Sequence, residues 1–198
     1  MEVEWLSEEF VPEQGAIEAA DDALQALRDR GSPSHDGLAA RLVAYDERGG
    51  HLALKLQPAR WALRLNQSDA SRSLAILCLV RDSQGRWLAG RRAAWVASWA
   101  GRWALGAGGS VELSENPVET LTRELQEEWS VEPERLSIEA LVCLQSMVVL
   151  FVGMAWLRDG ATVAPDEEHD EHAWWPADVS QWPPEADEPL RRMAALLG

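Results

Sequence analysis

The sequence predicts an α/β fold, with a mixed β-sheet in one principal domain and an α+β extension before it. Apolar runs typical of strands stand on both sides of one amphipathic helix near the middle of the 198 residues, and a second helical pattern closes the chain. Hydrophobic residues make up 46% of the composition, which is enough for a sizeable core. This order of strands, helix, strands and helix predicts a sheet covered by helices.

Residues 1–70 form the predicted extension. Its first fifteen residues are acidic and aperiodic, which indicates extended chain. Ile17–Arg30 carries apolar residues at helical spacing with charged residues opposite, which predicts an amphipathic helix. Residues 38–45 fit a helix or a strand, whereas the alternation at 51–56 and the composition of 59–65 indicate strands. The extension matches no motif, and three roles stay open for it: a cap, a substrate-recognition element or a homodimer contact.

The remaining elements follow a clearer pattern. The turn Arg81-Asp82-Ser83-Gln84-Gly85 lies between two apolar runs and predicts a hairpin. We expect an acidic loop at 164–172 and a closing helix at 187–196. Strands are predicted at 74–80, 86–92, 138–144, 147–157 and 173–175.

Charge excludes several classes of partner. The chain has 33 acidic and 18 basic residues, a net charge of −15, so non-specific binding to a nucleic acid polymer or an anionic membrane is unfavourable. Cys78 and Cys143 lie in apolar runs and are predicted to be buried free thiols. The sequence shows neither a signal-peptide pattern nor an apolar run long enough to span a membrane, and we expect a cytoplasmic protein.

The central helix has a strong start signal. Asn116 is a favourable N-cap, Pro117 suits the first helical position, and Glu119 completes a pattern like a capping box. Apolar residues then recur at helical spacing, so one side of the helix is expected to pack on the sheet. The preceding run Gly106-Ala107-Gly108-Gly109 permits a tight turn and close approach of main-chain carbonyls.

Three carboxylates on this helix point to a metal site. Glu124, Glu127 and Glu128 fall at i, i+3 and i+4, where like charges repel one another. Hard oxygen ligands of this kind suit Mg²⁺ or Mn²⁺, and a cation would turn the repulsion into attraction. A solvated acidic helix face is the alternative interpretation of the same residues.

The spacing decides between these interpretations, because it resembles the Nudix box, Gly-x5-Glu-x7-Arg-Glu-apolar-x-Glu-Glu-x-Gly-apolar. The required positions are occupied by Gly109, Glu115, Arg123, Glu124, Leu125, Glu127, Glu128 and Val131. Ser130 stands where the family has glycine. That position follows the helix and is expected to be left-handed, so serine there costs on the order of 1 kcal/mol without removing a ligand.

The resemblance implies a Nudix-like α/β/α sandwich at residues 71–198 and a hydrolase that cleaves a nucleoside diphosphate linked to another moiety, with Mg²⁺ or Mn²⁺ as cofactor. By position, Glu124, Glu127 and Glu128 would bind the metal and take part in catalysis, with the carbonyl of Gly109 as a further ligand. Arg123 would hold the glutamates by ion pairing, and Glu115 would support the loop and helix. A Nudix-fold module that binds nucleotide without hydrolysing it is the alternative.

Further candidates lie outside the box. In many Nudix proteins a glutamate six residues before a tryptophan lies near the metal; Glu168 and Trp174 have this relation, so Glu168 is a candidate general base. Four residues upstream of the glycine run could meet the substrate: Arg91, Arg92, Arg102 and Trp103. Ion pairing at the surface and packing of the indole are the alternatives for them. The sequence carries no downstream marker of a particular substrate.

Overall fold

The computed structural model describes residues 1–33 and 36–197, which form two compact units. The first comprises Met1–Ile76, Gly109–Thr120 and Leu141–Phe151, and the second comprises Leu77–Gly108, Leu121–Ala140 and Val152–Gly198. No helix among the described residues is long and apolar enough to cross a membrane.

In the first unit, a three-stranded sheet has the order β1-β3-β2. Strand β1 (Glu2–Trp5) runs parallel to β3 (His51–Arg60), and β2 (Leu38–Arg48) runs antiparallel to β3. Extended chain was expected at the start, and Glu2–Trp5 is extended as strand β1, whose partner β3 lies more than forty residues away in the sequence. Residues 38–45, which were open between helix and strand, are part of β2.

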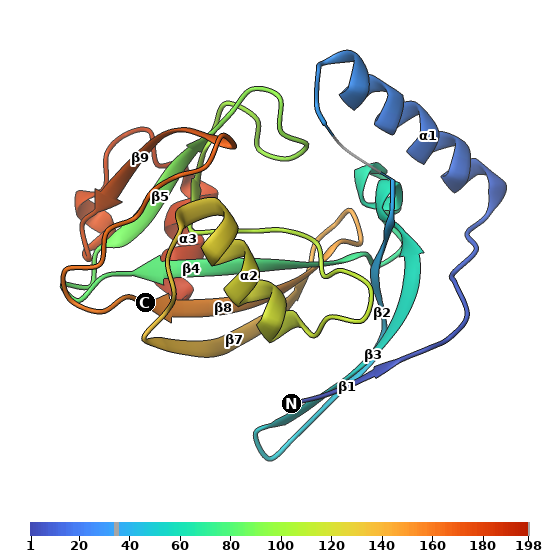
Figure 1. The fold of residues 1–198 in the computed structure, drawn as a ribbon, viewed down its shortest axis with the longest axis horizontal. Helices are drawn as coiled ribbons and strands as arrows, with labels where there is room; N and C mark the ends of the chain where they lie inside the picture. Colours follow the sequence, from blue (N-terminus) through green and yellow to red (C-terminus); the bar gives the residue numbers. More distant parts are fainter. Residues whose placement is uncertain (34–35, 198) are drawn as a thin grey trace. The chain divides into compact units, whose positions relative to one another are not determined.

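Helix α1 (Gln14–Asp29) carries the predicted apolar stripe, and Ala20 and Leu24 are buried in a cluster with Ala59, Ala62 and Leu63. Figure 1 shows α1 in blue along one side of this part of the chain. The strand expected at 59–65 is wrong beyond Arg60, since Trp61–Leu65 is a 3₁₀ helix, η1. The carboxylate of Asp36 accepts the Ala62 amide at 3.2 Å, so this amide does not take part in strand pairing.

The larger sheet has the order β6-β5-β4-β8-β7, and β9 is a further strand that pairs with β5. Its pairings are antiparallel for β4 with β5, β5 with β6, and β5 with β9, and the predicted hairpin closes between Arg81 and Trp87. The strands are β4 (Leu74–Arg81), β5 (Trp87–Arg92), β6 (Trp103–Leu105), β7 (Arg135–Cys143), β8 (Val149–Trp156) and β9 (His169–Trp175).

Two expectations are corrected in this part of the chain. Strand β9 begins at His169, so the acidic segment is a loop only as far as Glu168. Cys143 is exposed, because β7 is largely solvent-facing at its end, whereas Cys78 is buried as predicted.

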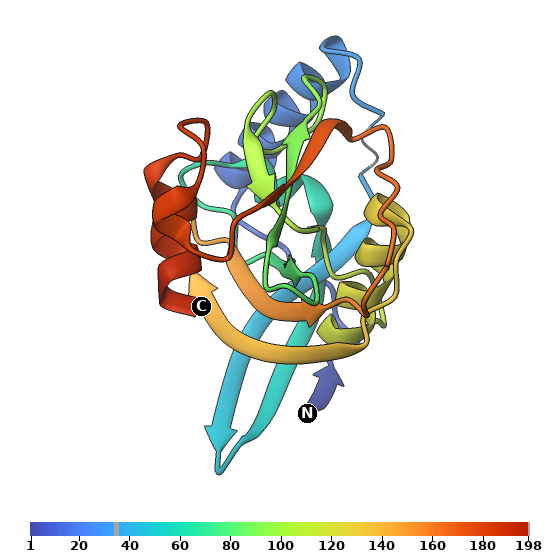
Figure 2. The same ribbon diagram turned by 90° about the vertical axis from the view of Figure 1, so that its left-hand side faces the viewer.

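Helices α2 (Pro117–Trp129) and α3 (Glu188–Leu197) complete the fold. Leu121, Leu125 and Trp129 of α2 are fully buried, which confirms its predicted packing stripe. Helix α3, red in Figure 2, follows the short 3₁₀ helix η2 (Val179–Gln181). The guanidinium of Arg191 donates to the main-chain oxygens of Val179 and Trp182, at 2.8 and 3.1 Å, and so fastens α3 to the preceding loop.

Candidate active site

The start of α2 has the predicted capping geometry. The side-chain oxygen of Asn116 accepts the amides of Val118 and Glu119, at 2.9 and 3.1 Å, and the carboxylate of Glu119 accepts the Asn116 amide at 3.0 Å. Two free helix donors and the cap residue's own amide are thus satisfied reciprocally. The first turn of the helix is therefore held without help from its acidic face.

The end of α2 is equally defined. Ser130 has φ of 55°, the left-handed conformation expected for the family's glycine position. The amide of Val131 donates to the carbonyl of Leu125 at 3.4 Å, the six-to-one bond of a Schellman motif. The serine thus adopts the glycine geometry, and the helix keeps its length.

Within the second unit, α2 is fastened to the glycine run. The indole of Trp129 donates to the carbonyl of Gly106 at 3.0 Å, and the amide of Gly108 donates to Glu128 Oε1 at 3.0 Å. Gly106 is required here, because it has φ of 62° and a Cβ would lie 1.8 Å from the carbonyl oxygen of Cys78. The glycine run thus positions a backbone donor on a helix carboxylate.

The three box glutamates differ in environment. Glu124 and Glu128 are 8% and 3% exposed, whereas the side chain of Glu127 is 57% exposed. Arg123 Nη1 lies 2.9 Å from both Glu124 Oε1 and Glu127 Oε2. The cluster is therefore not a uniformly solvated helix face: two carboxylates one turn apart are taken out of water.

This burial has an electrostatic cost. Burial raises the pKa of Glu124 from its usual 4.5 to about 7, with Arg123 opposing the rise and Glu127 and Glu168 adding to it. Burial also raises the pKa of Glu128 well above its ordinary value, against the effect of Arg92 and the Gly108 amide. Repulsion from Glu124 and Glu168 contributes to the rise at Glu128.

Glu168 is brought to the same place by the loop before β9. Arg92 lies between the two glutamates, with Nη1 3.3 Å from Glu128 Oε2 and Nη2 2.8 Å from Glu168 Oε2. The main chain reinforces this arrangement, because the amide of Ala93 donates to the carbonyl of Glu168 and the amide of Asp166 donates to the carbonyl of Glu128, at 2.8 and 3.0 Å. Glu168 is thus held beside the helix carboxylates by side chain and backbone together.

The donor set fits a divalent cation. Among the described residues, no three His, Cys, Asp or Glu side chains already stand in metal-ligand geometry. When all four carboxyl groups are ionised they face two guanidiniums, and the remaining two negative charges equal the charge of one divalent ion. The charged groups in this count are Glu124, Glu127, Glu128, Glu168, Arg92 and Arg123. Carboxylate oxygens are the ligands that Mg²⁺ and Mn²⁺ prefer.

Two other predicted residues belong to the first unit. The carbonyl of Gly109 accepts the amide of Ile76 at 2.8 Å. The carboxylate of Glu115 accepts the Thr120 hydroxyl at 2.9 Å and the Glu112 amide at 3.2 Å, so it braces the loop before α2. The carbonyl of Glu115 also accepts the indole N–H of Trp5 at 3.0 Å. The support role of Glu115 and the metal role of Gly109 stay predictions.

The four proposed substrate contacts have protein partners. Arg91 lies 2.6 Å from Glu171, and Arg102 is paired with Asp187. The Trp103 ring stacks at a tilt on Trp175, with 5.5 Å between centroids. Arg92 holds Glu128 and Glu168, as described above. Their roles in substrate binding stay predictions.

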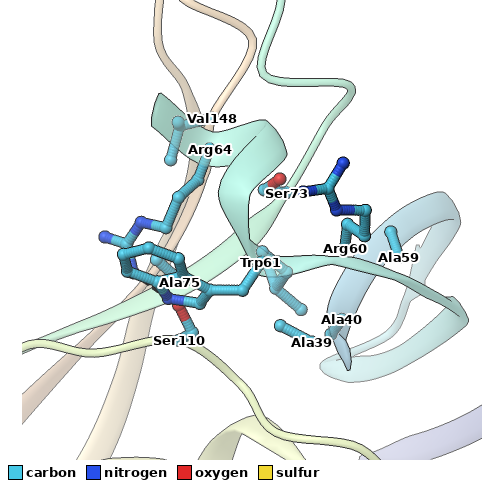
Figure 3. Close-up of a pocket in the computed structure, with 11 residues that line it drawn as sticks. Ala39, Ala40, Ala59, Arg60, Trp61, Arg64, Ser73, Ala75, Ser110 and Val148 are labelled. Carbon is cyan, nitrogen blue, oxygen red and sulfur yellow. Dashed lines mark hydrogen bonds between the residues drawn. The ribbon is translucent and has the colours of Figure 1, made fainter. Parts of the chain in front are cut away.

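A small pocket in the first unit adds no chemistry to this site. Figure 3 shows its lining of several alanines with the guanidiniums of Arg60 and Arg64. Arg60 pairs with Asp36 and Asp21, and Arg64 donates to the Ser110 hydroxyl. None of the lining residues is a predicted site residue.

Two site residues were not predicted from the sequence. His169 is buried with Nε2 3.5 Å from Glu128 Oε2, and Asp166 Oδ1 lies 3.2 Å from His169 Nδ1. A histidine in a strongly acidic segment was the available signal, but the segment looked like a solvated loop. Its burial depends on pairing of β9 with β5, which local sequence does not reveal.

The comparisons with known proteins agree with this description. A family model described as "NUDIX domain" matches residues 71–197. A structure of MutT from a study of Aliivibrio salmonicida and Vibrio cholerae is 20% identical, with a TM-score of 0.50 over 63% of this chain and 98% of that one. The MutT NUDIX hydrolase from Burkholderia pseudomallei is also 20% identical, with a TM-score of 0.50 over 63% of this chain and 96% of that one. No curated protein matches. The predicted α/β fold class is confirmed.

Proposed function

Because this chain belongs to the NUDIX domain family, we propose that it is a Nudix hydrolase, which cleaves a nucleoside diphosphate linked to another moiety with Mg²⁺ or Mn²⁺ as cofactor. The observation that carries the proposal is the burial of Glu124 and Glu128 one helical turn apart, with Glu168 held beside them. Burying carboxylates of like charge lowers the stability of the folded protein unless a partner or a metal ion compensates them. Nudix hydrolases generally use divalent metal ions, and this donor set suits one.

The chain's residues divide the work in this proposal. Glu124, Glu127 and Glu128 would hold the cation, with the carbonyl of Gly109 as a further ligand. When bound, the cation neutralises charge on the diphosphate oxygens and lowers the pKa of a water molecule. Arg123 orients two of the carboxylates through its contacts of 2.9 Å.

Glu168 is the proposed general base. Its side chain is 35% exposed, so water can reach it, and its contact with Arg92 Nη2 at 2.8 Å holds it in place. Water attacks one phosphorus of the diphosphate, its proton passes to Glu168, and the bond from that phosphorus to the bridging oxygen breaks. The products are a nucleoside monophosphate and the phosphorylated second moiety.

The substrate is a small molecule in this proposal, since the net charge of −15 disfavours a nucleic acid polymer. We further propose that residues 71–198 form the catalytic domain and residues 1–70 an extension to it. One contact favours a structural role for the extension. The Trp5 indole donates to the carbonyl of Glu115, and the carboxylate of Glu115 braces the loop before α2. A homodimer contact through the extension stays a prediction.

The test is product identification from a panel of nucleoside diphosphate derivatives, incubated with Mg²⁺ or Mn²⁺ and analysed by mass spectrometry. Glu127→Gln removes a proposed ligand from an exposed position, and Glu132→Gln removes an exposed glutamate just beyond the helix as a matched control. We expect hydrolysis by the wild type and the control, with a loss of at least tenfold in Glu127→Gln. An inert wild type over the whole panel would refute the proposal, and metal-independent nucleotide binding without turnover would support the non-catalytic module instead.

A further inference from the structure

The ring of His169 is a polar group buried between two carboxyl groups. Its side chain is 1% exposed, with Nδ1 3.2 Å from Asp166 Oδ1 and Nε2 3.5 Å from Glu128 Oε2. Among the described residues, no atom meets both the distance and the angle criteria for a hydrogen bond with Nε2. A buried polar atom of this kind is costly unless a partner satisfies it.

Packing prevents the ring from turning elsewhere. It lies against the Trp129 indole with 4.4 Å between centroids. On another side is Gly90 of β5, where a Cβ would lie 2.4 Å from His169 Cδ2. The absence of a side chain at Gly90 therefore makes room for the ring, which is tilted by 39° to the plane of the Trp129 indole. In this position Nε2 lies 3.5 Å from Glu128 Oε2.

Glu128 in turn has few other partners. Its Oε1 accepts the Gly108 amide at 3.0 Å, and its Oε2 receives a long contact of 3.3 Å from Arg92, which also donates to Glu168. A small rotation of the Glu128 carboxyl group would bring Oε2 within hydrogen-bond distance of Nε2. This contact would satisfy both buried atoms at once.

We propose that His169 is a positioning residue for Glu128: its Nε2 hydrogen-bonds the carboxyl group and sets the orientation in which Glu128 binds the cation, while Asp166 holds the ring from the other side. The inference rests on the proposed function, because it takes Glu128 as a metal ligand. It adds a group that does not touch substrate or cation but determines how well a ligand is presented. Partners of metal ligands commonly change affinity by about tenfold to a hundredfold.

The test compares two variants that differ only in hydrogen-bonding capacity. His169→Gln and His169→Met have side chains of similar length and both lose the stacked imidazole, but only glutamine can hydrogen-bond Glu128. His172→Gln and His172→Met are the matched control pair, on an exposed histidine of the same strand whose ring lies 6.0 Å from Trp129. Mn²⁺ affinity is measured by electron paramagnetic resonance of the free ion, with thermal unfolding of each metal-free variant as a measure of folding.

We expect His169→Met to bind Mn²⁺ about tenfold or more weakly than His169→Gln, which stays close to the wild type, with no such difference between the His172 variants. Equal affinity of the two His169 variants would overturn the inference, whereas a wild type that neither binds Mn²⁺ nor hydrolyses any substrate would overturn the proposed function. A second measurement uses only the wild type. Saturation with Mg²⁺ should shift the ring resonances of His169 but not those of His172, and an unmoved His169 would also overturn the inference.

Discussion

Glu124→Gln should stabilise the metal-free protein at pH 8, although it removes a proposed ligand. Glu124 is 8% exposed, and burial raises its pKa from 4.5 to about 7. A carboxyl group with a raised pKa in the folded state destabilises the fold increasingly as the pH rises from 4.5, and the effect is complete above 7. A pKa shift of this size lowers the free energy of unfolding at pH 8 by roughly 3 kcal/mol. Glutamine has no charge to bury, so this figure is the upper limit of the stabilisation that we expect.

The assay is urea unfolding in excess chelator at about pH 8 and about pH 5, with Glu127→Gln as the control. Glu127 lies on the same helix and also contacts Arg123, but its side chain is 57% exposed, so its replacement should change stability by no more than about 0.5 kcal/mol. The difference in stability between Glu124→Gln and the wild type should shrink markedly at pH 5, where Glu124 in the folded wild type is largely protonated. Added Mn²⁺ should stabilise the wild type more than the variant. A Glu124→Gln protein no more stable than the wild type at pH 8 would refute the reasoning.

Four further predictions concern positions outside the carboxylate cluster. Ser130→Gly should stabilise the protein by about 1 kcal/mol, since φ there is 55°, and an unchanged melting temperature would contradict this. Gly106→Ala should prevent normal folding, seen as loss of cooperative unfolding, because its Cβ would overlap the Cys78 carbonyl. A thiol reagent should label exposed Cys143 rapidly in the native state and Cys78 only after unfolding, since burial raises the pKa of Cys78 to about 12; equal rates would show that the native thiols are alike. Trp5→Phe keeps a ring but loses the donor to Glu115, so urea unfolding should show a loss of about 1 kcal/mol, and no loss would mean that the bond contributes nothing.

The elements that the sequence predicted well are those with local causes. The start of α2 was predictable because the residues of a capping box hydrogen-bond one another's main-chain amides within four positions. Its buried face was readable because helical spacing alone places Leu121 and Leu125 together. The turn after β4 was readable because Asp82 accepts the amides of two residues that closely follow it, at 3.0 and 2.8 Å.

The features that the sequence did not reveal have a different cause. Strand β1 exists because of main-chain bonds to β3, and the acidic stretch at His169 is a strand because β5 offers an edge. Such pairing depends on residues far away in the sequence. The exposure of Cys143 also depends on distant residues, since the sequence of an apolar strand does not reveal which of its faces other segments cover.

The sequence by itself therefore determined the family of this protein, because a spacing of glutamates on one helix is a local property. The left-handed conformation at Ser130 was predictable for the same reason. Only the tertiary structure decided which carboxylates are buried, because burial depends on what distant segments cover. It separated Glu124 and Glu128 from exposed Glu127, and it brought Arg92 and His169 to Glu128 from two other strands. The electrostatic imbalance that a divalent cation would relieve is thus a property of the folded chain.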